Sequence, residues 1–183
     1  MNIKGKFVTL RAMTRNDMPM IVDLFNDPEI ENLVVGWAFP LSLDQQNRWF
    51  DNHLGDQQSF RFVIETKDDG AVGIATLAGI DWKNRRADHG IKLLDKAQGK
   101  GIGTDALMAL MRYVFDELQF NRLDGSWFSD NIASKTMYMK CAWKEEGIRR
   151  EYIFKRGKWR DLVLTGVLKS DYLALLRNNH YWE

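Results

Sequence analysis

The sequence predicts a mixed α/β protein of the α+β class, with a mixed, mostly antiparallel sheet of about seven strands flanked by helices. Apolar residues alternate with polar ones along several segments, among them Arg86 to Leu94, which is the pattern of half-buried strands. Apolar residues at spacings of three and four, from Leu107 to Leu118, indicate a long amphipathic helix. A glycine-rich turn, Gln98 to Thr104, joins that strand to that helix.

The first strand is expected at Phe7 to Arg11. Thr14 is positioned to cap a helix that runs to about Asn26, and Pro19 fits only near the start of this helix. Asp27 and the proline that follows it end the pattern.

An irregular apolar stretch, Leu33 to Pro40, carries Trp37 and is expected to form a loop over a pocket. Ser42 then precedes a second helix from about Leu43 to Leu54, with Gln45 or Gln46 completing its cap.

Three strands should follow as an antiparallel meander that leads into the glycine turn. They are Phe60 to Thr66, Val72 to Trp82 and the strand that begins at Arg86, and polar turns join them. After the long helix the sequence predicts the strand Arg122 to Phe128, a short helix from Asn131 to Cys141, and the strands Glu146 to Lys155 and Leu162 to Leu168. The tail from Ser170 to Glu183 forms a short helix or frays.

Composition limits the classes of function. With 183 residues, 45% hydrophobic and 28% charged, the chain is expected to fold as one domain over residues 1–183. A net charge of +1 with interspersed signs removes the usual argument for a nucleic-acid or membrane partner. Without an apolar run long enough for a signal peptide or a membrane span, we expect a cytoplasmic location.

The side chains that usually carry metal or thiol chemistry are sparse. The histidines at positions 53, 89 and 180 are scattered and show no metal-ligand spacing, so no metal site is expected. Cys141, the single cysteine, lies among apolar residues and is expected to be a buried thiol rather than a nucleophile.

The glycine turn is a candidate phosphate site. Gly99, Gly101 and Gly103 allow positive φ and close backbone approach, so that successive N–H groups can face one anion at a helix N-terminus, which Thr104 can cap. The Gly-x-Gly-x-Gly spacing matches neither the Walker loop nor the dinucleotide fingerprint. From these residues alone, a tight strand-to-helix connection without a ligand remains the alternative.

The order of elements and three motifs resemble the GNAT N-acetyltransferase superfamily, in its branch of RimJ/RimL-like and polyamine acetyltransferases. Gln98 to Gly103 is similar to the acyl-CoA pyrophosphate loop of this family, Asn131 to Trp143 to its asparagine–tyrosine helix, and Gly157 to Asp161 to its Gly-x-x-x-Asp turn. The chain departs from the pattern at Ala142-Trp143, where the family has Gly-Phe, and lacks the proline often found before the loop.

The resemblance implies one acyl-CoA N-acyltransferase domain whose sheet splays between the strand before the glycine loop and the strand after its helix. It also implies acetyl-CoA as co-substrate. The pyrophosphate is expected on the backbone of Gln98, Gly99, Lys100, Gly101, Ile102, Gly103 and Thr104. The pantetheine arm is expected along the splayed strand edge at Ile91, Leu93 and Leu94, with Asn131 and Ser134 on its other side. A simple helix cap also accounts for Asn131.

The same resemblance suggests the catalytic groups. Tyr138 is expected to protonate the departing thiolate, although an ordinary packed tyrosine would look the same in sequence, and a backbone N–H near Leu93 would stabilise the oxyanion. Asp88 is the leading candidate for the base. His89, on the opposite face of the strand, and ordered water are the alternatives.

The acceptor is not legible from the sequence. A polyamine, an amino sugar, an amino-acid derivative and a protein N-terminus all remain open as the primary amine. Asp27, Glu29 and Glu31 could attract a cationic amine or could form a solvated loop. A non-catalytic acyl-CoA sensor of the same fold and a domain for an unrelated nucleotide are the competing classes. A homodimer or higher homo-oligomer is also expected.

Overall fold

The computed structural model describes residues 1–36 and 39–183, and Trp37 of the expected pocket loop lies outside them. Within these residues the strands form one sheet of eight, in the spatial order β1-β2-β3-β4-β5-β6-β8-β7. The strands are β1 (Ile3–Lys4), β2 (Val8–Ala12), β3 (Phe60–Thr66), β4 (Gly70–Asp81), β5 (Arg86–Leu93), β6 (Arg122–Phe128), β7 (Lys144–Lys155) and β8 (Lys158–Leu168). The fold class is therefore as predicted, with the two-residue β1 as an additional edge strand.

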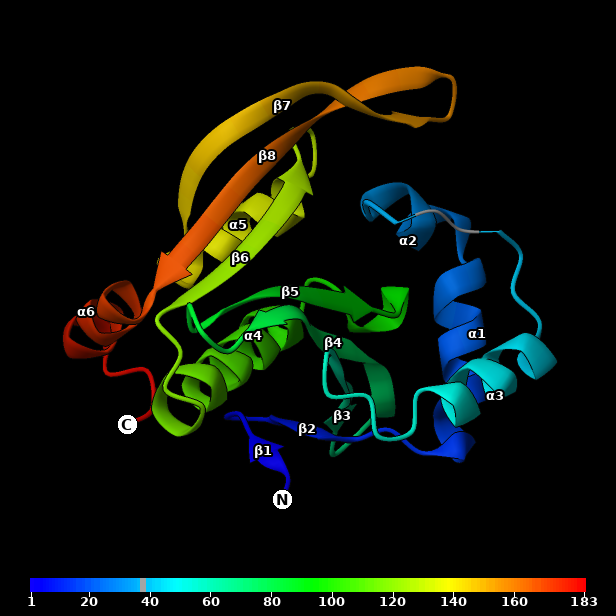
Figure 1. Ribbon diagram of the computed structural model, residues 1–183, viewed down its shortest axis with the longest axis horizontal. Coiled ribbons are helices and arrows are strands. Elements are labelled where there is room, and N and C mark those ends of the chain that lie inside the picture. The colour runs from blue at the N-terminus through cyan, green and yellow to red at the C-terminus, as the bar shows by residue number, and fades with distance from the viewer. Residues whose placement is uncertain (37–38) are drawn as a thin grey trace.

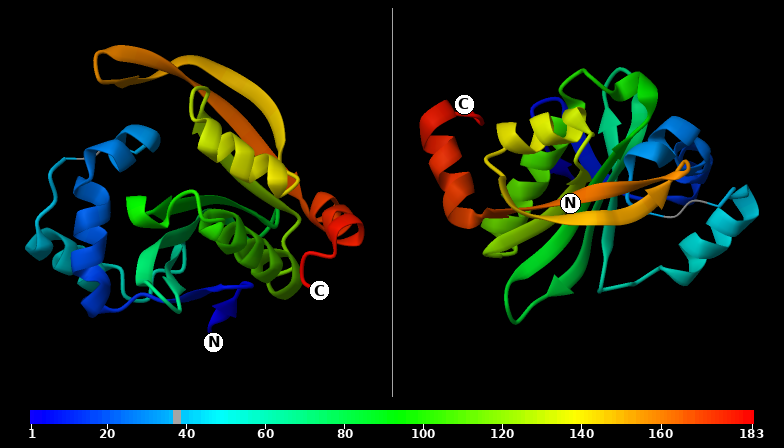
Figure 2. Two further views of the ribbon diagram at one scale, coloured as in Figure 1. Left: turned by 180° about the vertical axis from the view of Figure 1, so that it is seen from behind. Right: turned by 90° about the horizontal axis from the view of Figure 1, so that it is seen from above.

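Helices cover both faces of the sheet (Figures 1 and 2). The α-helices in the described residues are α1 (Met18–Asn26), α2 (Pro28–Leu33), α3 (Leu43–Asn52), α4 (Ile102–Arg112), α5 (Ile132–Lys140) and α6 (Lys169–Asn179). Helix α4 buries its apolar side against β2, β4 and β5, and α1 packs on α3 and on the opposite face of β4. The long periodic segment that begins in α4 ends in one turn of π-helix, Tyr113–Glu117.

The strands from β2 to β5 pair as the expected antiparallel meander. Strand β3 has the predicted bounds, and Val63 pairs with Ile74 in the register that places alternate residues on one face. Between β4 and β5 the pairing continues to Gly73 and Leu93. The polar turn at Lys67–Asp69 closes the hairpin between β3 and β4.

Strands β5 and β6 run parallel but stay paired for only three residues. Arg86, Ala87 and Asp88 lie in register with Arg122, Leu123 and Asp124, and no further pair follows. The two strands then diverge, with α4 and α5 on one side of the gap (Figure 1). The predicted splay is present, and it leaves the C-terminal half of β5 without a neighbour on its β6 side.

Two of the four predicted helix caps, Ser42 and Asn131, are present as expected. Ser42 caps α3 and forms a capping box with Gln45, whose N–H donates to the serine hydroxyl at 3.2 Å. Thr14 instead begins a short 3-10 turn, Arg15–Asp17, that leads into α1. Thr104 does not cap α4: the helix already begins at Ile102, with Gly101 as its N-cap. The left-handed Gly101 ends the turn three residues earlier than the threonine pattern suggested.

The last two strands are longer than predicted. Their connecting turn is only Arg156 and Gly157, so most of the segment from Gly157 to Asp161 belongs to β8 instead of a loop. Strand β7 forms the exposed edge of the sheet and contains two irregularities in its pairing with β8. No helix in the described part of the chain is long and apolar enough to cross a membrane.

Candidate active site

The glycine loop presents free backbone donors at the start of α4. Gly99 and Gly101 have φ of 72° and 80°, values that favour glycine. The first helical bond runs from the N–H of Asp105 to the carbonyl of Gly101 at 3.0 Å, so the N–H groups of Ile102, Gly103 and Thr104 have no acceptor within the helix. Together with the helix dipole, these free donors have the chemistry expected of the predicted pyrophosphate loop.

Gly103 brings α4 close to its neighbours. A Cβ at this position would lie 3.1 Å from Sδ of Met137 on α5 and 3.4 Å from Cδ1 of Leu93 on β5. Glycine thus allows the helix start, the strand end and α5 to meet. The side chain of Gln98 also holds this junction, because its Nε2 donates to the carbonyl of Leu93 at 3.3 Å.

A groove of about 380 Å³ runs from the glycine loop between the end of β5 and α5. Gln98, Gly99, Gly101, Gly103 and Thr104 line its loop end. Ile91, Lys92 and Leu93 line one side and Ser134 the other. The groove has free backbone donors at its loop end and apolar residues along its walls, which are the features that an acyl-CoA arm needs.

The free edge of β5 can bind an extended amide chain. Leu94 donates its N–H to the carbonyl of Val72 on β4 at 2.9 Å. Because N–H directions alternate along an antiparallel strand, the N–H groups of Ile91 and Leu93 point away from β4, into the gap left by β6. These are the donors expected for the pantetheine arm and the oxyanion.

Asn131 uses its side chain inside the protein. It caps α5, accepting from the N–H of Ser134 at 3.0 Å, and its Nδ2 donates to the carbonyl of Leu33 at 3.3 Å. The residue is 6% exposed. The helix-cap interpretation is therefore sufficient, and Asn131 also ties α5 to the end of α2.

A larger cavity of about 730 Å³ occupies the cleft between the separated strands. Residues from α2, β5, β6, α5 and the β7–β8 hairpin line it, among them Asp88, His89, Asp124 and Tyr138. It shares Leu33, Val34, Ile91, Lys92, Ser134 and Met137 with the groove. One molecule lying in the groove can thus reach a second molecule in the cavity.

Tyr138 lies on the α5 side of this cavity. Its ring stacks on Trp127 at a centroid distance of 5.0 Å, and His89 and Trp143 meet it edge-on. Burial raises the pKa of its hydroxyl, so the phenol stays protonated at neutral pH. A rigid, protonated phenol beside the cleft is suited to donate a proton.

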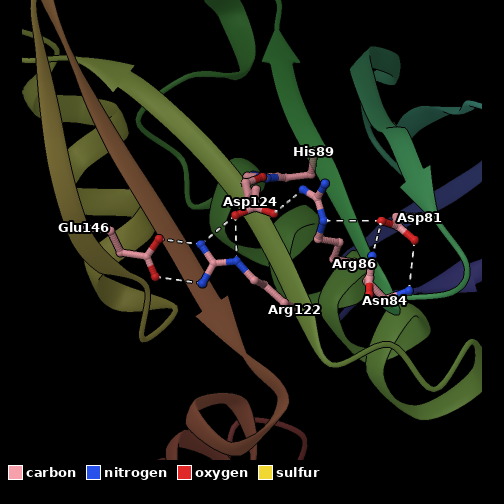
Figure 3. Close-up of polar contacts among 7 residues, drawn as sticks. All are labelled: Asp81, Asn84, Arg86, His89, Arg122, Asp124 and Glu146. Atoms are coloured by element: carbon pink, nitrogen blue, oxygen red, sulfur yellow. Dashed lines mark hydrogen bonds and ion pairs between the residues drawn. The ribbon is translucent and has the colours of Figure 1, made fainter.

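Asp88 and Asp124 lie where the strands begin to separate. Figure 3 shows Asp124 between its arginine partners. Arg122 donates from Nε to Asp124 at 2.7 Å and from Nη1 to Glu146 at 2.8 Å, and Nη1 of Arg86 lies 3.6 Å from Asp124. Asp88 has no such partner in the described residues. Burial and the nearby charge of Asp124 raise the pKa of Asp88, against a smaller opposing effect of Arg86.

His89 faces the other side of β5, as strand alternation requires. Its Nδ1 lies 2.9 Å from the carbonyl of Asp124, which makes that nitrogen the donor (Figure 3). Burial lowers the pKa of His89 to about 4, so the ring is neutral at physiological pH. Gly125 leaves room for it, since a Cβ there would lie 2.7 Å from Cε1.

The acidic residues of the first connection are already paired. Glu31 accepts from Lys155, and Glu29 lies 3.1 Å from Nη2 of Arg156. Asp27 caps α2, accepting from the N–H groups of Glu29 and Ile30 at 2.8 and 3.1 Å. These contacts fasten α2 to the β7–β8 hairpin, and the three carboxylates do not face the cavity as free charges.

Cys141 is fully buried, and burial raises its pKa to about 12. A neutral thiol at this depth confirms the structural role expected for it and excludes it as the nucleophile.

A family model describing the acetyltransferase (GNAT) domain matches residues 8–144. The chain belongs to the GNAT acetyltransferase family. The match agrees with the splayed sheet and the glycine loop at the start of α4. The resemblance inferred from the three sequence motifs is therefore confirmed, and this GNAT chain is an acetyl-CoA-dependent N-acetyltransferase.

Two curated relatives align with almost the whole GNAT chain. Spermidine N(1)-acetyltransferase of Vibrio cholerae is 27% identical over 166 residues, which cover 91% of this chain and 95% of the relative. The SPbeta prophage-derived uncharacterized N-acetyltransferase YokL of Bacillus subtilis is 26% identical over 168 residues, 92% of this chain and 93% of the relative.

A solved structure agrees with the fold. The crystal structure of spermidine N-acetyltransferase from Vibrio cholerae in complex with CoA and spermine superimposes with a TM-score of 0.85 at 27% identity. The alignment covers 91% of this GNAT chain and 98% of that one.

Several residues of the cavity wall were not among the predicted site residues, and two of them bear on the chemistry. Lys92 on β5 and Arg149 on β7 both line the large cavity. Strand alternation places Lys92 on the same face as Asp88, which is a signal the sequence contained. The place of Arg149 depends on how β7 crosses the cleft and had no sequence signal.

Proposed function

We propose that this enzyme transfers the acetyl group of acetyl-CoA directly to a small primary amine, with both substrates bound at once. The continuity of the groove and the large cavity carries the proposal: they share wall residues at Ile91, Lys92 and Met137, where a thioester and an amine would meet. Direct transfer requires no covalent acyl-enzyme intermediate. The buried thiol of Cys141 is not available to form one.

The chain's own groups then have the following roles. The loop from Gln98 to Thr104 binds the pyrophosphate through Gly99, Lys100, Gly101, Ile102 and Gly103, and the edge from Ile91 to Leu94 binds the pantetheine arm. Ser134 contributes its hydroxyl from α5, whereas Asn131 positions that helix. The N–H of Leu93 stabilises the oxyanion that forms when the amine nitrogen attacks the thioester carbon.

Protons move through two residues. Asp88, whose carboxylate has no arginine partner within ion-pair distance in the described residues, accepts the proton of the attacking amine directly or through water. Tyr138 donates its phenolic proton to the sulfur as the carbon–sulfur bond breaks. We assign the base to Asp88 instead of His89, because burial lowers the pKa of His89 to about 4 and its ring is packed against Tyr138 and Trp143.

The cavity favours a small amine over a polypeptide. The contacts of α2 with Lys155, Arg156 and Arg160 of the hairpin form a bridge beside the cleft. Relatives from Vibrio cholerae and Escherichia coli are named for spermidine, which is also a small amine, whereas a Bacillus subtilis relative is named a putative ribosomal N-acetyltransferase.

The proposal is tested by release of CoA thiol from acetyl-CoA with polyamines, amino acids, amino sugars and basic N-terminal peptides as acceptors. We expect turnover with one class of small amine and a large loss in Tyr138→Phe. Acetyl-CoA binding without turnover on any acceptor, or turnover only on peptides, would overturn it.

A further inference from the structure

Some of the charged side chains that line the large cavity form ion pairs within the protein, and others do not. Asp124 and Glu146 are paired with Arg122 within the protein, and Arg86 also lies 3.6 Å from Asp124. Among the described lining residues, the charged side chains without an ion-pair partner are Asp88, Lys92 and Arg149. The cavity therefore offers its occupant one free carboxylate and two free cations.

Lys92 is the cation nearest to the reacting groups. It precedes Leu93, shares the face of β5 with Asp88, and lines both the cavity and the acyl-CoA groove. Its ammonium lies 4.2 Å from the centroid of the Phe25 ring of α1, a cation–π contact that leaves the charge without an anionic partner.

The surroundings of Lys92 are themselves positive. Arg61 on β3 stacks on Trp49 at 4.4 Å and, like Lys155, acts on Lys92 as a like charge. Among the described residues, the carboxylate of Glu31 forms its ion pair with Lys155 and not with Lys92. Burial, together with these two cations, lowers the pKa of Lys92 to about 8. A negative group bound here would stabilise the charged form of Lys92 against both burial and the two neighbouring cations.

Arg149 adds a second unpaired cation from the other wall. Its Nη1 donates to the hydroxyl of Tyr152 at 3.0 Å, and its guanidinium lies 4.9 Å from the centroid of the same ring. Neither contact neutralises the charge.

We propose that the acceptor carries an anionic group, a carboxylate or a phosphate, within a few bonds of the amine that is acetylated, and that Lys92 binds this group. The inference rests on the proposed function and narrows its substrate class. The amine lies between Asp88 and Lys92, four residues apart on one strand face, so that its proton faces the carboxylate and its anionic substituent faces the ammonium. A polyamine would place a second cation against Lys92 and Arg149, which is unfavourable.

Matched acceptors that differ only by the anionic group test this proposal. Lysine is cadaverine with a carboxylate, and O-phosphoethanolamine is ethanolamine with a phosphate. We expect kcat/KM of the wild-type enzyme to favour the anionic member of at least one pair by about tenfold or more, chiefly through KM. Which pair responds distinguishes a carboxylate from a phosphate.

Variants at position 92 connect the preference to the side chain. Lys92→Met keeps the length of the stem and should abolish the preference, while Lys92→Arg should retain most of it. Lys83→Met, in an exposed turn, is the control and should leave it unchanged. Binding of CoA and the melting temperature show whether each variant is folded.

The outcomes distinguish the preference for an anionic acceptor from the acetyl transfer itself. Turnover that favours cadaverine and ethanolamine in the wild type, or a preference that survives Lys92→Met, overturns the inference while leaving the proposed acetyl transfer intact. Failure of every small amine to turn over overturns both.

Discussion

Asp88 and Asp124 are the last residues in register between β5 and β6 before the two strands separate. Their side chains differ in what neutralises them: Arg122 donates to Asp124 at 2.7 Å, whereas Asp88 has no such donor in the described residues. Burial and the charge of Asp124 raise the pKa of Asp88. The cleft thus opens beside a carboxylate that holds a proton more readily than an exposed aspartate does.

Asp88→Asn should remove the acid limb of the pH–rate profile. In the wild type, kcat/KM falls as the pH drops through the raised pKa of Asp88, because only the carboxylate accepts the amine proton. The variant should be about 100-fold slower at neutral pH and should lack this limb. Measuring both profiles with the same amine is the check, and an unchanged limb would assign the base elsewhere.

Asp88→Asn should also change how the free energy of unfolding depends on pH. A carboxyl group whose pKa is raised on folding binds its proton more tightly in the folded state, so wild-type stability falls as pH rises from the ordinary value of 3.8 through the raised pKa. Asp88→Asn should lose this dependence and be at least as stable as the wild type at pH 7. Urea unfolding at pH 4 and pH 7 measures the difference, and a variant much weaker at pH 7 would contradict it.

Tyr138→Phe should lower kcat by about 100-fold, since general-acid catalysis contributes at least that much. The KM for acetyl-CoA should stay within about twofold, and the melting temperature should hold, because the phenyl ring keeps its contacts with Trp127 and Trp143. Tyr113→Phe, whose ring meets Phe62 edge-on away from the cleft, is the matched control. Equal rates in the two variants would show that Tyr138 only packs.

Gly101→Ala should weaken acetyl-CoA binding and cost about 1–2 kcal/mol of stability, because φ at this position is in the left-handed region. The nearest atom to an added Cβ is Cζ of Phe7 at 3.6 Å, so the cost comes from the backbone and not from crowding. Gly147→Ala, with open space around it, should change neither quantity. Calorimetric titration with CoA and thermal unfolding measure both effects.

Ala142→Gly should stabilise the protein by several tenths to about 1 kcal/mol. Ala142 follows the tyrosine helix at φ 61°, where the GNAT pattern has glycine, so the turn keeps a conformation that strains a Cβ. The greater flexibility of glycine in the unfolded chain offsets part of the gain. Ala133→Gly, inside α5, should destabilise instead, by about 1 kcal/mol. A lower midpoint in Ala142→Gly would show that the turn has no such strain.

Asp105→Asn should cost about 2–4 kcal/mol in urea unfolding, since it leaves buried donors poorly matched. The carboxylate is fully buried in the first turn of α4 and accepts from the N–H groups of Lys6, Phe7 and Val8 at 2.8, 2.9 and 3.0 Å. It also accepts from the Tyr181 hydroxyl at 2.9 Å. Asp68→Asn in the exposed β3–β4 turn is the control. A small effect would mean that water replaces these bonds.

Segments whose pattern is local were predicted well. The strand from Phe60 to Thr66 has the predicted bounds, and Ser42 with Gln45 forms the predicted box, because alternation and capping depend on neighbours in sequence. The prediction of Thr104 as the cap of α4 was wrong for the same reason. A threonine fits the local capping pattern, but the left-handed Gly101 ends the turn earlier and the helix begins at Ile102. The edge strand β1 is too short to give a pattern.

The sequence by itself determined the fold class, the meander, the place of the glycine loop between a strand and a helix, and the face of β5 that each residue occupies, since all of these follow from periodicity and backbone chemistry. Only the tertiary structure decided which charges remain free. Glu29 and Glu31 are paired with a hairpin more than 120 residues away in the chain, and Lys92 has no ion-pair partner in the part of the chain that the structure describes. Ion pairing depends on which side chains meet in space, and no local pattern records that distance.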